Sequence, residues 1–225
     1  MNPSLSPQAI IFDMDGVLID SEHWWPITEH TYYSKLFRGW EQSHLGNLMG
    51  KSAKDIHAYL CNTFACSLAY DEYLALYRTM ADEVYAHARL MPNVLMVLKT
   101  LKRHTIPTAL ASSATREIIS TVLHRFPLRP YFAAAVSAED VAMRGKPAPD
   151  IYLYTAQRLN ITPRECLAIE DSAHGITAAK SARMQVFAYQ TPYNKTQQLN
   201  DADKIITNLM DILAFLNLSH PSRQQ

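Results

Sequence analysis

Short runs of apolar residues alternate with segments of helical periodicity along most of this chain. The runs are brief and contain few polar residues, which is typical of strands buried on both faces of a parallel sheet. They predict six strands, at residues 9–12, 107–112, 133–137, 166–170, 185–189 and 204–207. Helical patterns separate most of these runs, at residues 94–103, 116–125, 150–159, 175–182 and 208–216. The alternation predicts an α/β fold with a doubly wound, Rossmann-like parallel sheet.

One long region between the first two strands breaks this alternation. From about residue 22 to residue 87 we find no convincing strand, whereas 71–88 has the spacing of an amphipathic helix. Weaker helical patterns cover 24–37 and 53–64. We therefore expect a core domain interrupted by a helical insert. The expected core comprises residues 1–19 and 91–225, the insert residues 20–90, and the hinges between them residues 18–21 and 90–93.

Composition and charge describe an ordinary globular protein. The 225 residues are 48% hydrophobic and carry a formal net charge of zero, so nothing indicates nucleic acid or an anionic membrane as a partner. No apolar run approaches the ~20 residues that span a bilayer, and the N-terminus lacks the pattern of a signal peptide. Three cysteines without a zinc spacing indicate a reducing compartment. We expect a cytoplasmic protein that is a monomer or a weak homodimer.

Paired acidic residues follow two of the predicted strands. Asp13 and Asp15 follow the first strand in the stretch IIFDMDG, and Glu170 and Asp171 end the fourth in LAIEDS. One such pair alone could be an exposed turn. Two pairs at the ends of strands, where sheets of this kind bind ligands, favour a functional site over two unrelated turns. Converging carboxylates repel one another unless a cation lies between them. Oxygen ligands without nearby Cys or His favour magnesium over zinc, so we predict a Mg²⁺ site here.

Two other stretches could bind an anion. Ser112 and Ser113 end the second strand just before Thr115, a predicted helix N-cap. Their hydroxyls and the free N–H groups at the helix start could hold a phosphate, although capping alone would also explain them. Lys146 lies in a loop stiffened by a proline, before a predicted helix. It could neutralise a phosphate, and the alternative is a solvated loop lysine.

In this order the motifs resemble those of the haloacid-dehalogenase-like hydrolase superfamily, over nearly the whole chain. FDMDG is similar to the first family motif, LASS to the second, the Lys146 loop to the third and IEDS to the fourth. The stretch GVLIDSE, and an insert that would form a cap, resemble the branch with β-phosphoglucomutase, sugar-phosphate phosphatases and phosphoglycolate phosphatase. The resemblance implies a Mg²⁺-dependent phosphatase acting on a small phosphorylated metabolite, and we expect a sugar phosphate.

The resemblance also implies roles for individual residues. Asp13 would be the nucleophile that forms an aspartyl-phosphate, and Asp15 the general acid that later activates water. The metal would be held by Asp13, the backbone carbonyl of Asp15, and Asp171, with Glu170 as a further ligand or a support. Ser112, Ser113 and Lys146 would bind the phosphate. In the cap, we expect substrate contacts from Trp24, Lys51 and Lys54.

Other activities of similar proteins would place different demands on these residues. Dehalogenation would leave Asp15 and the second acidic pair without a role. Phosphonatases carry a cap lysine in a segment similar to LMGKSAKDIH, but Ala53 occupies that position here. A β-phosphoglucomutase, the main alternative, has a histidine slightly later than His23. A non-catalytic binding module would be expected to lose an aspartate of the first motif, and both are present.

Overall fold

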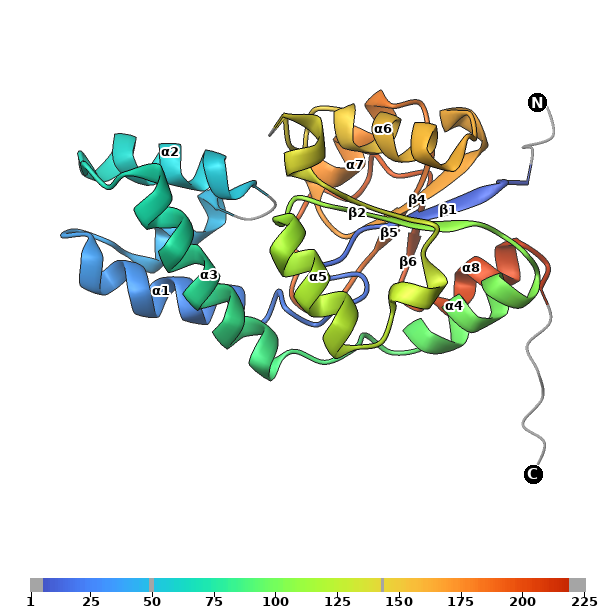
Figure 1. Ribbon diagram of the computed structural model, residues 1–225, viewed down its shortest axis with the longest axis horizontal. Coiled ribbons are helices and arrows are strands. Elements are labelled where there is room, and N and C mark those ends of the chain that lie inside the picture. The colour runs from blue at the N-terminus through green and yellow to red at the C-terminus, as the bar shows by residue number, and fades with distance from the viewer. Residues whose placement is uncertain (1–5, 49–50, 143, 219–225) are drawn as a thin grey trace.

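The core of the protein is a six-stranded parallel sheet with helices on both faces (Figure 1). The computed structural model describes residues 6–48, 51–142 and 144–218. The strand order is β3-β2-β1-β4-β5-β6, which confirms the predicted doubly wound α/β architecture. The strands are β1 (Ala9–Phe12), β2 (Thr108–Ser112), β3 (Ala134–Ser137), β4 (Cys166–Glu170), β5 (Gln185–Tyr189) and β6 (Lys204–Ile206).

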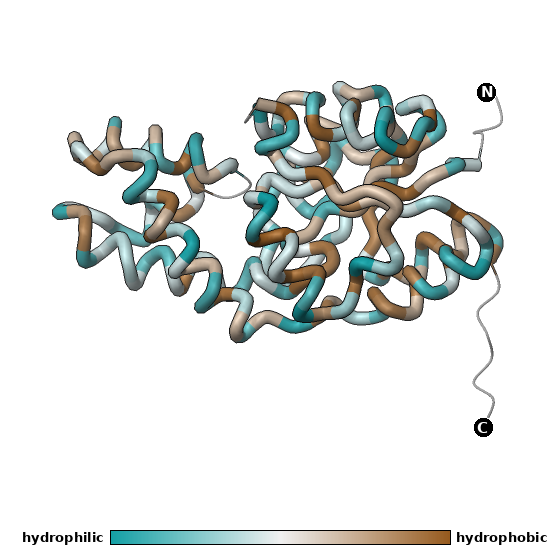
Figure 2. Tube along the Cα trace, viewed as in Figure 1, coloured by the Kyte–Doolittle hydropathy of each residue, from teal (hydrophilic) through white to brown (hydrophobic). Residues whose placement is uncertain are grey.

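Two hydrophobic cores lie on opposite faces of this sheet, because successive strand side chains point to opposite sides. In β1, which is fully buried, Ile10 and Phe12 pack into one core while Ala9 and Ile11 pack into the other. The first core is covered by α4 (Val94–Arg103), α5 (Arg116–Arg125) and α8 (Met210–Phe215), and the second by α6 (Asp150–Leu159) and α7 (Ala173–Ser181). Figure 2 shows hydrophilic residues recurring along the outer helices.

Three helices of the insert form a separate group beside the sheet (Figure 1). They are α1 (Trp25–Leu36), α2 (Ala53–Phe64) and α3 (Tyr70–His87), with a short 3₁₀ helix, η1 (Gln42–Asn47). In the described residues between 22 and 87 there is no strand. The described part of the core also contains the 3₁₀ helices η2 (Arg129–Tyr131), η3 (Ala138–Val141) and η4 (Pro163–Glu165).

The two connections between insert and core lie side by side. The N–H of Asp20 donates to the carbonyl of Arg89 at 2.8 Å, and the N–H of Met91 donates to the carbonyl of Leu18 at 2.9 Å. Both connections fall where hinges were expected, and their movement stays a prediction. Within the described part of the chain, no helix combines the length and apolarity needed to cross a membrane.

Candidate active site

The sheet topology brings the predicted site residues together. Strand β1 lies between β2 and β4, so the residues at the carboxyl ends of these three strands are neighbours. Asp13 follows β1, Ser112 ends β2, and Glu170 and Asp171 lie at the end of β4. The chain runs from β1 through β2 to β3 on one side of the sheet and then crosses to β4 on the other side of β1. The switch point therefore lies between the carboxyl ends of β1 and β4, which is where such sheets bind ligands.

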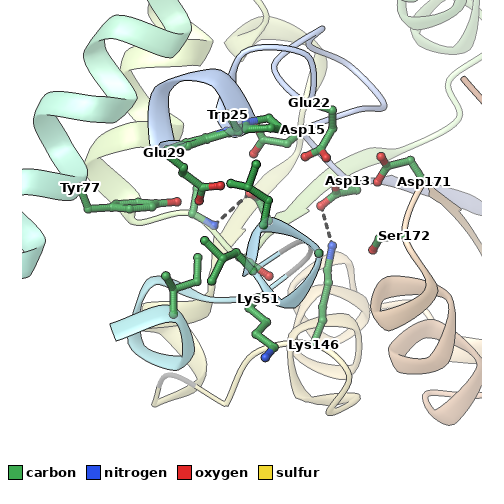
Figure 3. A pocket seen from close by; sticks show the side chains of 18 residues that line it. Asp13, Asp15, Glu22, Trp25, Glu29, Lys51, Tyr77, Lys146, Asp171 and Ser172 are labelled. Atoms are coloured by element: carbon green, nitrogen blue, oxygen red, sulfur yellow. Dashed lines mark hydrogen bonds and ion pairs between the residues drawn. The ribbon is translucent and has the colours of Figure 1, made fainter. Parts of the chain in front are cut away.

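A buried lysine joins two of the acidic residues. Lys146 Nζ lies 2.5 Å from Asp13 Oδ1 (Figure 3). It also lies 2.5 Å from Glu170 Oε1 and donates to the carbonyl of Ala111 at 3.3 Å. Burial opposes the charge of the ammonium group, but the carboxylates of Asp13 and Glu170 outweigh burial and raise the pKa of Lys146. Lys146 is therefore a permanent cation beside Asp13.

Glu170 is fully buried, and its two oxygens are occupied by donors from the protein. Oε1 accepts from Lys146 and from the hydroxyl of Tyr152 at 2.5 Å. Oε2 accepts from the N–H of Asp171 at 3.1 Å and from the Ser172 hydroxyl at 3.2 Å. Of the two roles expected for Glu170, this arrangement favours the support of Lys146 over direct ligation of a metal.

Two glycines permit the close approach of backbone to these carboxylates. A Cβ on Gly175, in the first turn of α7, would lie 2.0 Å from the Glu170 carboxylate carbon. A Cβ on Gly16 would lie 2.0 Å from Asp171 Oδ2, and Gly16 also has a φ of +75°. Any side chain at either position would displace an acidic group of the site.

The acidic cluster has the composition of a magnesium site. Carboxylate oxygens of Asp13, Glu170 and Asp171 all lie within 4.8 Å of one another, and the three residues are buried. Burial and the neighbouring carboxylates raise the pKa of Asp13 despite Lys146, while burial and the charges of Glu22 and Asp13 raise the pKa of Asp171. The Asp171 carboxylate accepts no hydrogen bond from a described residue. A hard dication would offset this excess of negative charge, so the donors fit Mg²⁺.

The side chain of Asp15 lies outside this cluster and is held by the insert. Its Oδ1 accepts from the Ser21 hydroxyl at 2.5 Å and from the Tyr85 hydroxyl, on α3, at 2.7 Å. Strand β1 ends at Phe12, so Asp13 and Asp15 do not follow the alternation of a strand, although both line the same cavity. Burial raises the pKa of Asp15, although the hydrogen bonds from Ser21 and Tyr85 oppose the shift. A raised pKa suits a group that donates a proton.

The two serines at the end of β2 differ in what they contact. The Ser112 Oγ accepts from the N–H of Ala114 at 3.1 Å, whereas the buried Ser113 Oγ has no hydrogen-bond partner among the described residues. Thr115 caps α5 by accepting from the N–H of Ile118, as predicted. Since Thr115 satisfies the helix start, the Ser113 hydroxyl remains available to a ligand.

These groups line a cavity of about 250 Å³ between the core and the insert (Figure 3). That volume suits a small metabolite. Asp13, Asp15, Ser113, Lys146 and Asp171 face it from the core side. Of the predicted site residues in the core, only Glu170 is absent from its lining, because Glu170 is covered by Lys146 and Tyr152.

The insert contributes residues that differ from those expected. Lys51 lines the cavity, but Trp24 and Lys54 do not. The Trp24 ring stacks on His87 at 4.8 Å, and Lys54 is exposed near the start of α2. The neighbouring Trp25, the first residue of α1, lines the cavity instead of Trp24, together with Pro26 and Glu29.

Several residues of the site had not been identified from the sequence. Tyr85 donates to Asp15 and Tyr152 to Glu170, and the Asn194 side chain donates to the carbonyl of Asp171 at 2.8 Å. Glu22 and Glu29 line the cavity from the insert. Tyr85 lies within the predicted helix 71–88, but nothing in the local pattern distinguished it as a residue of the site.

Comparisons with known proteins agree with this arrangement. A family model described as haloacid dehalogenase-like hydrolase matches residues 10–189. Hexitol phosphatase B of Escherichia coli O157:H7 is 31% identical over 206 residues, covering 89% of this chain and 90% of that protein. A "probable pseudouridine-5′-phosphatase" of Drosophila melanogaster is 28% identical, covering 89% of each. A solved β-phosphoglucomutase of Clostridium difficile has the same fold, with a TM-score of 0.76 and 23% identity over 94% of this chain and 97% of that one.

Proposed function

This chain belongs to the haloacid dehalogenase-like hydrolases, and from that premise we propose a Mg²⁺-dependent phosphatase that forms an aspartyl-phosphate on Asp13. The observation that carries the proposal is the pairing of Asp13 with Lys146 at 2.5 Å on the wall of a small cavity. A nucleophile beside a fixed cation is what attack on an anionic phosphate requires, because the two reactants otherwise repel each other.

In the first proposed step, a carboxylate oxygen of Asp13 attacks phosphorus while the bond from phosphorus to the leaving oxygen breaks. Asp15 gives its proton to that oxygen and becomes a carboxylate. Lys146 and the Ser112 and Ser113 hydroxyls contact the phosphate oxygens, which carry the developing charge.

In the second step, water attacks the phosphorus of the aspartyl-phosphate, and Asp15 accepts the proton of that water. The bond between phosphorus and Asp13 breaks, which releases inorganic phosphate and restores both aspartates. The hydrogen bonds from Ser21 and Tyr85 fix the orientation of Asp15 through both steps. A group used first as acid and then as base needs this restraint, because it serves two reacting atoms in turn.

Asp13 and Asp171, with the backbone carbonyl of Asp15, would hold Mg²⁺. When bound, Mg²⁺ would lower the negative charge on both the nucleophile and the phosphate. Glu170 would act on the site through Lys146, which it holds at 2.5 Å.

The substrate we propose is a sugar phosphate or a related small phosphate ester. The relatives are named for hexitol phosphates and for pseudouridine 5′-phosphate, and the cavity volume of about 250 Å³ is compatible with such molecules. We also propose that residues 20–90 form a cap that excludes water during the reaction, and that the enzyme works in the cytoplasm as a monomer or weak homodimer.

Metal removal tests this function directly. Chelation of the purified protein should abolish phosphate release from p-nitrophenyl phosphate and from sugar phosphates, and added Mg²⁺ should restore it. Asp171→Asn should raise the Mg²⁺ concentration needed for half-maximal activity at least about tenfold. Asp201→Asn, an exposed change of the same kind in the core, serves as the control. Full activity in thoroughly metal-stripped protein would contradict the proposed site.

A further inference from the structure

The carboxyl group of Glu29, on the insert side of the cavity, has no hydrogen-bond partner among the described residues. Glu29, on α1, is 6% exposed, and its carboxyl group receives no hydrogen bond or ion pair from any described residue. Figure 3 shows this group directed into the cavity, on the opposite wall from Asp13 and Lys146. Buried carboxyl groups are ordinarily paired or hydrogen-bonded, because burial removes them from water. An unpaired one that faces a ligand cavity indicates that the partner is the ligand.

The surroundings of Glu29 define which ligand chemistry would suit it. The nearby cavity wall contains the aromatic rings of Trp25 and Tyr77, stacked at a centroid distance of 5.1 Å, and a second carboxyl group, that of Glu22. Among the described residues that the insert contributes to the lining, Lys51 is the sole cation, and its ammonium group lies over the ring of Tyr59. The insert therefore offers hydrogen-bond acceptors and aromatic faces.

We propose that Glu29 is a specificity-determining residue that accepts hydrogen bonds from hydroxyl groups of the leaving group, and that the enzyme selects phosphate monoesters of uncharged polyhydroxylated compounds. This inference rests on the phosphatase function proposed above. Hydroxyl groups would pair with Glu29 and Glu22, while C–H faces of the same molecule would contact Trp25 and Tyr77. An additional anionic group on the leaving group would be buried against carboxyl groups and aromatic rings that do not compensate its charge, which disfavours its binding.

The expected discrimination follows from the cost of an unpaired buried group. A site built to hydrogen-bond a hydroxyl rejects an analogue without it, because the buried acceptor then stays unpaired. We expect kcat/KM for a hexitol 6-phosphate to exceed that for n-hexyl phosphate by about a hundredfold. We expect kcat/KM for glycerol 1-phosphate to exceed that for 3-phosphoglycerate by a similar factor, because 3-phosphoglycerate carries a carboxylate in place of a hydroxymethyl group.

The test compares Glu29→Leu and Glu29→Gln with Asp82→Asn in the full-length protein with Mg²⁺. Asp82 is an exposed acidic residue on α3, so its amide controls for a changed charge on the insert. Each protein is assayed with the hexitol phosphate, n-hexyl phosphate, 3-phosphoglycerate, phosphoethanolamine and p-nitrophenyl phosphate. Glu29→Leu should lower kcat/KM for the hexitol phosphate at least tenfold more than for p-nitrophenyl phosphate. Glu29→Gln, which keeps an acceptor oxygen, should lie between Glu29→Leu and the wild type.

The possible outcomes separate the specificity role of Glu29 from the phosphatase function on which it rests. If the wild type hydrolyses p-nitrophenyl phosphate but both Glu29 variants keep its selectivity, the role of Glu29 is wrong and the phosphatase function stands. If the wild type prefers 3-phosphoglycerate or phosphoethanolamine, the polyhydroxylated class is wrong. If no phosphate ester is hydrolysed, the phosphatase function fails and the inference fails with it. The Gln variant keeps the test valid if the Leu variant does not fold.

Discussion

At the scale of single residues, Asp13 combines burial with a direct bond to a cation. Burial raises its pKa, and Lys146 opposes the shift from 2.5 Å away. In the metal-free protein these effects compete, so the ionised nucleophile depends on positive charge nearby. Asp15 lacks such an ion pair and is held by two neutral hydroxyls. Two carboxyl groups two positions apart thus have different environments, which suits one for attack and the other for proton transfer.

Replacing the nucleophile tests the assignment of Asp13. Asp13→Asn should lower turnover at least about a thousandfold, because an amide of the same shape cannot attack phosphorus. The variant should remain folded, since Asn keeps an oxygen for Lys146. Steady-state release of inorganic phosphate and the melting temperature should be measured together, with Asp201→Asn as the matched control. Near-normal turnover in Asp13→Asn would show that covalent catalysis by this residue is wrong.

Glu29 gives a prediction about pH and stability that does not depend on substrate. Burial, together with Glu22, raises the pKa of Glu29 from 4.5 to about 8 in the folded protein. The folded state therefore binds this proton more tightly than the unfolded state, and stability falls as pH rises from about 4.5 to about 8.

Glu29→Gln removes this ionisation, so its stability should lack this pH dependence. The free energy of unfolding of the variant minus that of the wild type should therefore increase by about 1–3 kcal/mol between pH 5 and pH 8.5. Urea denaturation of the metal-free proteins at several pH values measures the difference. A difference that stays constant with pH would mean that Glu29 titrates normally in the folded state.

At the scale of elements, the sequence predicted what local patterns determine. All six strands are present within one residue at each end, because each is a short apolar run bounded by turn residues. Helices α2, α4, α5 and α6 have the predicted bounds, since their buried positions recur at helical spacing. The observed bounds of α7 and α8 differ from the predicted ones by two residues or less. Helix α7 begins at Ala173, two residues before the predicted start, because the Ser172 side chain caps it by accepting from the N–H of Gly175.

Local patterns did not reveal contacts between distant segments. Tyr85 lies 70 positions from Asp15, and Asn194 lies 23 from Asp171. Whether a tyrosine on an apolar helix face fills the core or donates to a carboxylate depends on what packs opposite it. The same reason explains the choice of Trp25 over Trp24, since adjacent helical positions differ by about 100° in direction. The orientation of α1 against the core was needed to decide between them.

Gly175 allows a test of the close packing of α7 against the Glu170 carboxylate. Gly175→Ala should lower the free energy of unfolding by about 1–3 kcal/mol, because the new Cβ would lie 2.0 Å from the Glu170 carboxylate. That carboxylate is held by Lys146 and Tyr152 and has little room to move. Gly46→Ala is the matched control, since a Cβ there meets no atom within 4 Å. Equal stabilities of the two variants, measured by chemical denaturation, would contradict this packing.

At the scale of the whole molecule, both the core and the insert contribute residues to the candidate active site. The core supplies Asp13, Lys146 and Asp171, while the insert supplies Tyr85, which bonds to Asp15. The insert also makes the cavity wall opposite the nucleophile, with Trp25 and Glu29. His23 is absent from the lining of this cavity, and its ring packs against those of Trp24 and Tyr193, each at a centroid distance of 5.0 Å. Movement of the insert would therefore change both substrate contacts and the restraint on Asp15.

The placement of His23 bears on the choice between a phosphatase and a phosphosugar mutase. Both would phosphorylate Asp13, and they differ in what reaches the phosphorylated enzyme next. A mutase must hold water off while a bisphosphorylated sugar reorients, whereas a phosphatase admits water. No histidine lines the cavity within the described residues, so the cap histidine of the mutases has no counterpart there. We therefore expect the phosphorylated enzyme to react with water.

Supplying β-glucose 1-phosphate with and without a trace of β-glucose 1,6-bisphosphate distinguishes the two activities. Inorganic phosphate and glucose 6-phosphate are followed in the same reaction. We expect phosphate release that the bisphosphate does not stimulate, and little glucose 6-phosphate, because each phosphorylated Asp13 meets water first. Glucose 6-phosphate that forms only with bisphosphate, many times faster than phosphate, would assign the enzyme as a mutase.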